Sequence, residues 1–391
     1  MNRNLWLLAI LQGLFLTNNV TFIAINGLVG LSLAPLGWMA TLPVMGYVVG
    51  SALSTGIVAR TQRQLGRKRS FQLGLVVAML SALLCTYAAA SSNFWLLCFA
   101  TVVAGYYNAN AGLYRFAAAE LATTPAVRDK AVSMVMAGGL LGAVLGPNLA
   151  ARTRDLFVVP FAGAYISLAG IALLAMVLMS FIQFAPPPAR VAGSGGGRSL
   201  ARIMAQPIFI VSAGAGALSY GVMNLLMAAT PIAMQQCRLP FSEAALVIEW
   251  HVIGMFAPAF FTGSLIKRFG ALPVMGVGLA LYLACIAIAL SGVELEQFLA
   301  ALFLLGIGWN FLFTSSTTLS LSAYSPEERD RAQGALNFFV FATLALSSFA
   351  SGVLVTTRGW ALLNYGSLLP VALMAIALIW LGLKTGRPAT A

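Results

Sequence analysis

Long runs of apolar residues repeat along the whole chain, each followed by a short polar segment. The hydrocarbon core of a bilayer is about 30 Å thick, and a helix needs about 20 residues to cross it. Lipid offers the backbone no hydrogen bonds, so each run has to be helical. The pattern predicts an all-α membrane protein with twelve transmembrane helices, over residues 5–30, 37–59, 71–90, 94–119, 131–150, 158–183, 207–234, 241–265, 272–291, 297–321, 333–355 and 360–382.

The chain also divides into two similar halves. The segment APPPARVAGSGGGR, from Ala185 to Arg198, has the composition of a flexible linker. At a shift of about 200 residues, PAVRDKA at 125–131 matches PEERDRA at 326–332, and YN at 107–108 matches WN at 309–310. We therefore predict an N-terminal six-helix bundle over residues 1–184, a cytoplasmic linker over 185–204 and a C-terminal six-helix bundle over 205–391.

Composition and charge support a membrane protein rather than a nucleic-acid-binding one. Apolar residues make up 60% of the chain and charged residues 8%, against about 25% charged in soluble domains. If Arg3 is cytoplasmic, 17 of the 22 Lys and Arg fall on that side of the predicted topology, four fall opposite, and Arg115 lies inside a span. By the positive-inside rule, both termini are expected in the cytoplasm of a bacterial-type inner membrane. The net charge of +12 is then explained by topology and contact with lipid headgroups.

Parallel repeats of six spans are typical of the major facilitator superfamily, and several motifs resemble that family. GIVARTQRQLGRKRS at 56–70 resembles its loop signature between spans two and three, and TGSLIKRFG at 262–270 resembles a second copy. LLGAVLGP at 140–147 resembles the span-five motif of its antiporter branches. Arg63 and Lys267 replace the signature's Asp, so the resemblance covers the whole chain without identifying a branch. It implies a transporter that works by alternating access.

Glu249 and His251 are candidates for proton coupling. Both lie inside the predicted span 241–265, where an ionisable side chain is unfavourable by roughly 3 kcal/mol unless it faces a cavity or a partner. Two residues apart on a helix, their side chains point about 200° apart. Only one of them is therefore expected to face a central cavity, and we favour Glu249. Otherwise, Glu249 lines a water-filled vestibule and His251 is a packed, hydrogen-bonded side chain.

Polar and aromatic residues gather on the first and fourth spans of each half, which line the central cavity in this family. The substrate-cavity candidates are Asn18, Asn19, Tyr107, Asn108, Asn110, Arg115, Tyr220, Asn224, Trp309, Asn310 and Phe313. Rings beside amides suit a flat, partly polar organic molecule. For each amide the alternative is hydrogen bonding between helices. For Arg115 it is snorkelling to the membrane surface.

The gate candidates follow from the resemblance and the repeat. The resemblance pairs Arg67 with Glu120 as a latch at the cytoplasmic gate, and it places a bend at Gly146 and Pro147. Arg128 with Asp129, and Arg329 with Asp330, open the fifth helix of each half. At a helix start the acid is stabilised by the helix dipole, so a purely structural role is the alternative for these two pairs.

Together these features predict a secondary active transporter that carries a small organic solute, with protons as the coupling ion. Efflux-type antiport is favoured through LLGAVLGP. The alternatives are an uptake permease for a vitamin-like or metabolite solute, a passive uniporter, or a sensor that does not transport. The chain has no nucleotide-binding loop and no paired cysteine spacing, so we expect no enzyme activity, cofactor or metal. We also expect a monomer.

Overall fold

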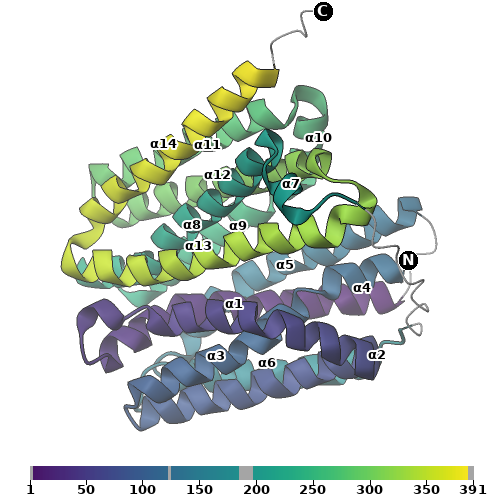
Figure 1. Ribbon diagram of the computed structural model, residues 1–391. Coiled ribbons are helices and arrows are strands. Elements are labelled where there is room, and N and C mark those ends of the chain that lie inside the picture. The colour runs from purple at the N-terminus through teal and green to yellow at the C-terminus, as the bar shows by residue number, and fades with distance from the viewer. Residues whose placement is uncertain (1–2, 122–124, 185–196, 386–391) are drawn as a thin grey trace, which may run out of the picture.

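The computed structural model describes residues 3–121, 125–184 and 197–385, and all regular secondary structure in these ranges is helical (Figure 1). The first half contains α1 (Arg3–Leu33), η1 (Gly37–Met39), α2 (Leu42–Ala90), α3 (Phe94–Ala111), α4 (Tyr114–Glu120), α5 (Pro125–Thr153) and α6 (Ala162–Ser180). The second half contains α7 (Leu200–Met204), α8 (Pro207–Gln236), α9 (Phe241–Phe256), α10 (Ala259–Phe269), α11 (Ala271–Ser291), α12 (Leu295–Ser320), η2 (Leu321–Ala323), η3 (Pro326–Glu328), α13 (Arg329–Thr357) and α14 (Gly359–Thr385).

Among the described residues, nine helices are long and apolar enough to cross a membrane, or ten if the bent pair α9 and α10 is one span. The expected number was twelve. One difference arises because α2 covers two expected spans and is broken only at Gly66, whose φ of 77° is left-handed. Another arises because the expected span 94–119 is divided into α3 and the short α4. The all-α membrane fold is confirmed, although the count of separate helices differs.

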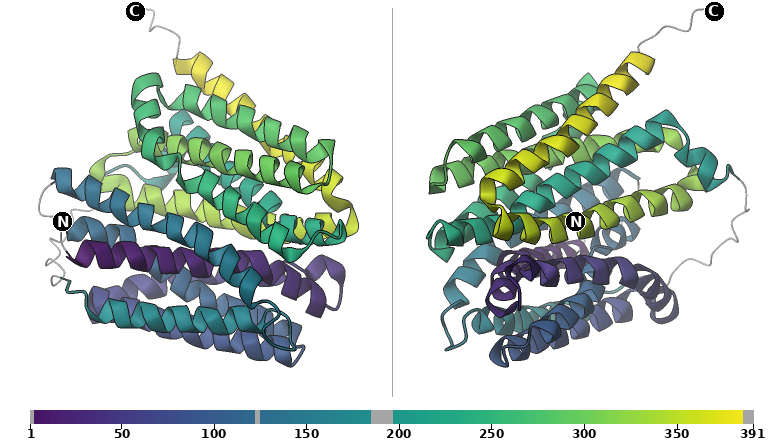
Figure 2. Two further views of the ribbon diagram at one scale, coloured as in Figure 1. Left: turned by 180° about the vertical axis from the view of Figure 1, so that it is seen from behind. Right: turned by 60° about the vertical axis from the view of Figure 1, so that its left-hand side comes forward.

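The helices form two groups, α1 to α6 and α7 to α14, which lie side by side (Figures 1 and 2). Small residues let helices within a group approach closely, as is usual in membranes. A Cβ at Gly138 or Gly142 of α5 would run into the backbone of α1. α5 also contains Pro147, and the Thr21 hydroxyl of α1 donates to the neighbouring Gly146 carbonyl at 3.0 Å. This bond joins α1 to α5 beside the proline, whereas the carbonyl that Pro147 leaves without its helical donor is that of Ala143.

The two ends of the molecule differ. We call "linker end" the end that carries Arg3, Gly66, α7 and the start of α13, and "far end" the opposite one, made by residues 34–41, 91–93, 154–161, 237–240 and 358. At the linker end, Lys68 donates to the Ser180 carbonyl at 2.6 Å and Arg3 donates to that of Phe181 at 3.2 Å. These contacts tie α1, α2 and α6 together within the first half.

The predicted linker over 185–204 is only partly described, because residues 185–196 lie outside the described ranges. Its last part is structured: α7 packs on the second half through the fully buried Ile203. The predicted division into two bundles and a linker remains a prediction.

Candidate functional site

An aromatic cluster lies where α8, α9 and α12 meet, and we define it as Tyr220, Phe256, Trp309 and Phe313. The rings of Trp309 and Phe313 stack at 5.2 Å with an interplanar angle of 9°. Tyr220 meets both edge-on, at 5.1 and 5.2 Å, and Phe256 lies 6.4 Å from Trp309. The indole nitrogen of Trp309 is buried without a hydrogen-bond partner. The cluster therefore combines closely packed flat rings with one unused donor, on a Trp309 side chain that is buried in this conformation.

Arg115 brings a positive charge from the first half toward this cluster. It lies on α4, its side chain is exposed, and its guanidinium sits 4.9 Å above the Phe116 ring. Its charge acts on the Tyr220 hydroxyl of α8 in the second half. Arg115 is thus near enough to the second half for its charge to act there, and its part in a substrate cavity stays a prediction.

Polar side chains of the first half form a network across three helices. The Asn19 amide of α1 donates to the Tyr47 hydroxyl of α2 at 3.2 Å and to the Asn108 oxygen of α3 at 3.1 Å. Asn108 in turn donates to the Ser51 hydroxyl at 2.8 Å. Asn19 and Asn108 stay partly exposed, whereas Asn18 is buried. This network fixes the Asn19 and Asn108 amides and leaves both partly accessible.

Three candidate asparagines are instead buried between helices of their own half. Asn110 donates to the Ser70 carbonyl at 2.8 Å, and Asn224 donates to hydroxyls of α13 at 2.8 and 2.9 Å. Asn310 donates to the Met255 carbonyl and accepts from Thr262, at 2.7 and 2.6 Å. Tyr107 is also buried, edge-on to Phe15 at 5.7 Å. Here the structure favours helix-to-helix bonding over a cavity.

Glu249 and His251 point in different directions, as the helical spacing predicted. The Glu249 carboxylate of α9 is partly exposed and accepts from the Asn148 amide of α5, in the other half, at 2.6 Å. His251 is fully buried, and its Nδ1 lies 2.7 Å from the Leu302 carbonyl of α12. Glu249 therefore lies on a contact between the halves, while His251 packs inside one of them.

Further contacts join the halves at the far end. The Thr41 hydroxyl at the start of α2 donates to the Ser348 carbonyl of α13 at 2.6 Å. Trp38 lies edge-on to Phe349, with ring centroids 5.9 Å apart. Alongside these contacts, α1, α2, α5 and η1 pack against α8, α9 and α13. The far end is thus closed.

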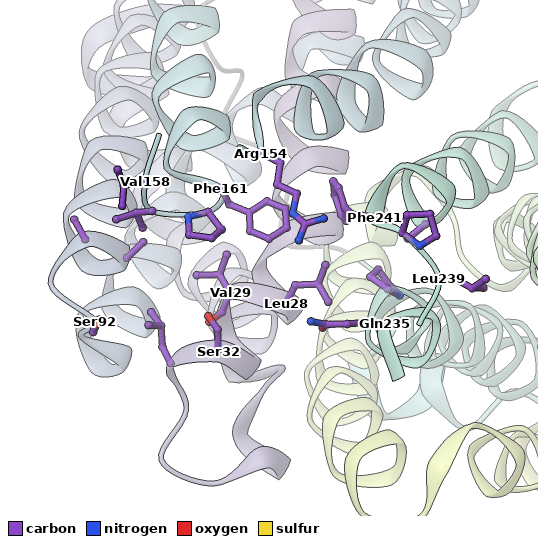
Figure 3. Close-up of a pocket in the computed structure, with 18 of the residues that line it drawn as sticks. Leu28, Val29, Ser32, Ser92, Arg154, Val158, Phe161, Gln235, Leu239 and Phe241 are labelled. Carbon is purple, nitrogen blue, oxygen red and sulfur yellow. The ribbon is translucent and has the colours of Figure 1, made fainter. Parts of the chain in front are cut away.

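A cavity of about 640 Å³ lies within this closed end, between the halves (Figure 3). Its walls include Leu28 and Val29 of α1, Phe161 before α6, Gln235 of α8 and Phe241 of α9. The Arg154 side chain lies between the rings of Phe161 and Phe241 (Figure 3).

The gate candidates at the linker end are partly described. Arg67 and Glu120 form a two-point ion pair, with Nε donating to Oε2 at 3.0 Å. Both belong to the first half, so this pair does not itself bridge the halves. The side chains of Arg128, Asp129 and Asp330 lie outside the described residues. Arg329 is exposed at the start of α13.

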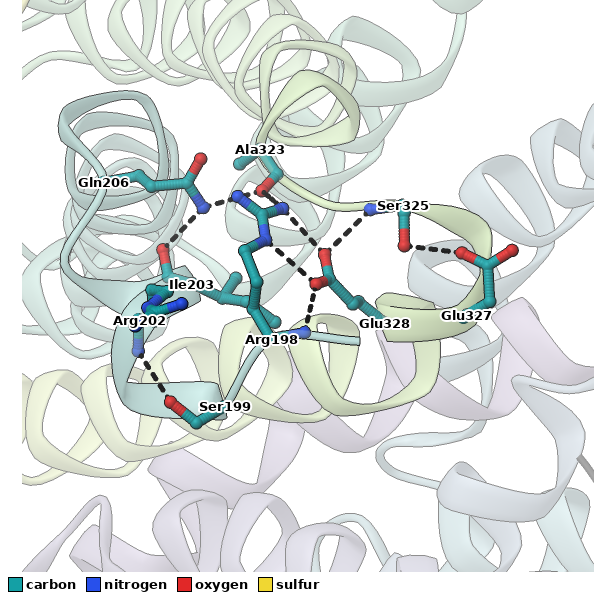
Figure 4. Close-up of polar contacts among 9 residues, drawn as sticks. All are labelled: Arg198, Ser199, Arg202, Ile203, Gln206, Ala323, Ser325, Glu327 and Glu328. Carbon is teal, nitrogen blue, oxygen red and sulfur yellow. Dashed lines mark hydrogen bonds and ion pairs between the residues drawn. The ribbon is translucent and has the colours of Figure 1, made fainter. Parts of the chain in front are cut away.

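Sequence reasoning missed a second ion pair at the linker end, which we call the clip (Figure 4). The Glu328 carboxylate, buried to 3% exposure, accepts from Nε and Nη2 of Arg198 at 2.9 and 2.7 Å. It also accepts hydrogen bonds from the backbone N–H groups of Arg198 and Ser325, at 2.6 and 3.0 Å. These donors hold the pKa of Glu328 well below its usual range. The clip fixes the end of the linker to the turn before α13.

The repeat carried a signal for this pair. Its second copy has Glu327 and Glu328 where the first has Ala126 and Val127. Acids that are present only in the second copy indicate a basic partner that the first copy does not have.

Comparisons with known proteins agree with this architecture. The family model of the Major Facilitator Superfamily matches residues 5–247 and 212–391. The chain is 39% identical over 382 residues to riboflavin transporter RfnT of Brucella anthropi, covering 96% of this chain and 95% of that protein. It is 28% identical to the uncharacterized MFS-type transporter YdeG of Bacillus subtilis, covering 87% and 83%.

Among solved structures, the fold is similar to that of nucleoside transporter NupG, with a TM-score of 0.74 at 13% identity. That match covers 96% of this chain and 99% of the other. Repeated halves, apolar helices and full-length family matches agree, and the chain belongs to the major facilitator superfamily of membrane transporters.

Proposed function

We propose that this transporter carries riboflavin into the cell. The observation that carries the proposal is the 39% identity to riboflavin transporter RfnT over 96% of the chain. This is the vitamin-uptake alternative of the sequence analysis rather than the favoured efflux antiport, for which LLGAVLGP is the sole support.

The aromatic cluster suits this substrate chemically. Riboflavin has a flat three-ring system with carbonyl groups along one edge and a chain of hydroxyls. Ring stacking on the Trp309 and Phe313 faces would hold the flat part. The unpartnered indole N–H of Trp309 and the charge of Arg115 would meet the carbonyl groups. Asn19 and Asn108 of the first half are partly exposed and would serve the hydroxyls.

The closed far end supports alternating access in which the halves rock about the bound solute. We take the far end as extracellular, because the basic residues concentrate at the linker end. The described conformation is then the one closed to the outside. The proposed moving parts are the stretch of α5 around Gly146 and Pro147, and the Arg67–Glu120 pair beside the Gly66 break. A monomer in a bacterial-type inner membrane is sufficient for this cycle.

Protons are the proposed coupling ion, with Glu249 as the group that carries them. Its carboxylate lies on an interhelical contact that must break when the far end opens, because Asn148 belongs to the opposite half. A carboxylate at such a contact changes both its surroundings and its proton affinity between the two states. His251 lacks this connection to the other half.

Uptake by a riboflavin auxotroph tests the proposal. Cells without their own riboflavin transporter should grow on micromolar riboflavin when they express this chain, and they should accumulate labelled riboflavin. An empty vector and a Trp309→Ala variant are the controls. Growth no better than with the empty vector, from a chain shown to be in the membrane, would rule out riboflavin uptake. Riboflavin export from preloaded cells would instead favour efflux.

A further inference from the structure

The cavity at the far end has a composition of its own, distinct from the aromatic cluster. About 640 Å³ in volume, it falls in the range of small-molecule sites. Much of its wall is apolar, with Pro160, Pro231 and Pro240 beside two phenylalanines. Two arginines, Arg154 and Arg238, also line it.

Arg154 is held in a way that leaves hydrogen-bonding capacity unused. Its guanidinium lies 5.4 Å from the Phe161 centroid and 5.7 Å from the Phe241 centroid, and these rings meet edge-on at 5.0 Å. Its Nε is buried and has no hydrogen-bond partner among the described residues. This Nε and the Asp155 carboxylate form an ion pair at 3.5 Å, and the carboxylate is 76% exposed. That distance is longer than an ordinary N–H···O hydrogen bond, so the buried Nε–H keeps unused donor capacity.

The loops around the cavity also adopt unusual backbone conformations. Within the described ranges, the residues other than glycine with positive φ are Ser92, Phe161 and Arg238, at 50°, 64° and 63°. All three line this cavity. Side chains at positive φ are strained, and such strain collects at functional sites. The three loops thus present side chains to the cavity where glycine would be the easier residue.

We propose that this cavity binds a flat aromatic molecule that carries a negative charge. The ring would lie against the proline and phenylalanine walls, and the anionic group would face Arg154 and Arg238. The combination of charge and ring selects this class, because a neutral ring leaves the buried Arg154 Nε–H without a hydrogen-bond acceptor and a bare anion leaves the walls empty. This site shares no lining residue with the proposed riboflavin site, which consists of the aromatic cluster with Arg115, Asn19 and Asn108.

Flavin mononucleotide is a suitable probe, since it joins a flat ring system to a phosphate. Titration of the purified full-length chain, in nanodiscs of uncharged lipid, should show saturable quenching of flavin fluorescence. Arg154→Gln and Arg238→Gln should each weaken this binding at least tenfold. Arg358→Gln is the matched control, because Arg358 is an exposed far-end arginine that does not line the cavity. Arg238→Gln keeps the test valid if Arg154→Gln fails to fold, because the Arg238 side chain is exposed and its replacement leaves the packing of the fold unchanged.

Equal affinity in all three variants, or no saturable binding at all, would overturn the proposal. Displacement of the probe by inorganic phosphate at the same concentration would overturn the aromatic part, because phosphate alone would then suffice. Riboflavin uptake is measured separately, in proteoliposomes made from the same purified protein and variants. Uptake without probe binding supports the proposed function and contradicts this inference. Probe binding without uptake supports this inference and contradicts the proposed function.

Discussion

At the scale of single residues, the aromatic cluster depends most on Trp309, which touches three other rings. Stacking of a flat ring on an aromatic side chain contributes about 1–3 kcal/mol. Trp309→Ala should therefore weaken riboflavin binding about 5- to 150-fold, as measured by quenching of flavin fluorescence. Trp309→Phe should retain most of the affinity.

Trp95→Ala is the matched control, because that ring is 61% exposed on α3. A Trp309→Ala variant that binds riboflavin as tightly as the unaltered chain would place the solute elsewhere.

Glu249→Gln separates coupling from transport at the same scale. Glutamine still accepts the hydrogen bond from Asn148 but cannot take up a proton. We expect accumulation driven by a pH gradient to fall to the equilibrium level, while exchange of labelled for unlabelled riboflavin continues. Both are measured in proteoliposomes. Pumping that survives in Glu249→Gln would show that another group carries the proton or that coupling is absent.

Among elements, the clip ties α13 to the linker and predicts a definite pH dependence. Arg198 and two backbone N–H groups lower the pKa of Glu328, so the ionised form is favoured in the folded state. Its stabilising effect is full above the unfolded pKa of about 4.3 and is lost as pH falls toward the lowered folded value. Glu328→Gln should therefore lower the melting temperature by a constant amount from pH 8 to about pH 5, and by less below about pH 4.

The reversed pair Arg198→Glu with Glu328→Arg provides the control for this prediction. It should recover part of the stability that either single reversal loses, because the two charges still meet. Without any recovery, the clip would owe its effect to backbone contacts alone.

The helices themselves were largely predictable, because the cost of unpaired backbone in lipid leaves no other structure for a long apolar run. The points where one helix ends and the next begins were less predictable. The polar segment between two expected spans continues as helix on both sides of Gly66, since charged residues form helix as readily as loop. The break after α3 falls at Gly112 and Leu113, inside an apolar run that carries no stronger stop signal.

The site was predictable as a set of helices but not residue by residue. An amide in lipid needs a partner, and the sequence does not say whether a helix or a solute supplies it. Asn110, Asn224 and Asn310 found partners on neighbouring helices, whereas Asn19 stayed partly exposed. Helical spacing did predict that Glu249 and His251 face apart.

For the whole molecule, alternating access requires that the far end open, and the Trp38–Phe349 contact offers a direct test. Trp38→Cys with Phe349→Cys, in a chain whose native Cys85, Cys98, Cys237 and Cys285 are replaced, places two thiols across the closed interface, where the native rings meet edge-on. Joining them with a short cross-linker should abolish riboflavin transport nearly completely, and a cleavable linker should allow recovery.

Binding of riboflavin from the linker end should persist in the cross-linked protein, because the aromatic cluster belongs to the second half alone and keeps its geometry. A pair at positions 68 and 180 is the control, since Lys68 and Ser180 touch within the first half and their cross-link leaves the two halves free to move. If transport continued at full rate with the far end cross-linked, solute could not be crossing by the rocking of one half against the other. Inhibition by both cross-links would instead mean that movement within a half also limits the cycle.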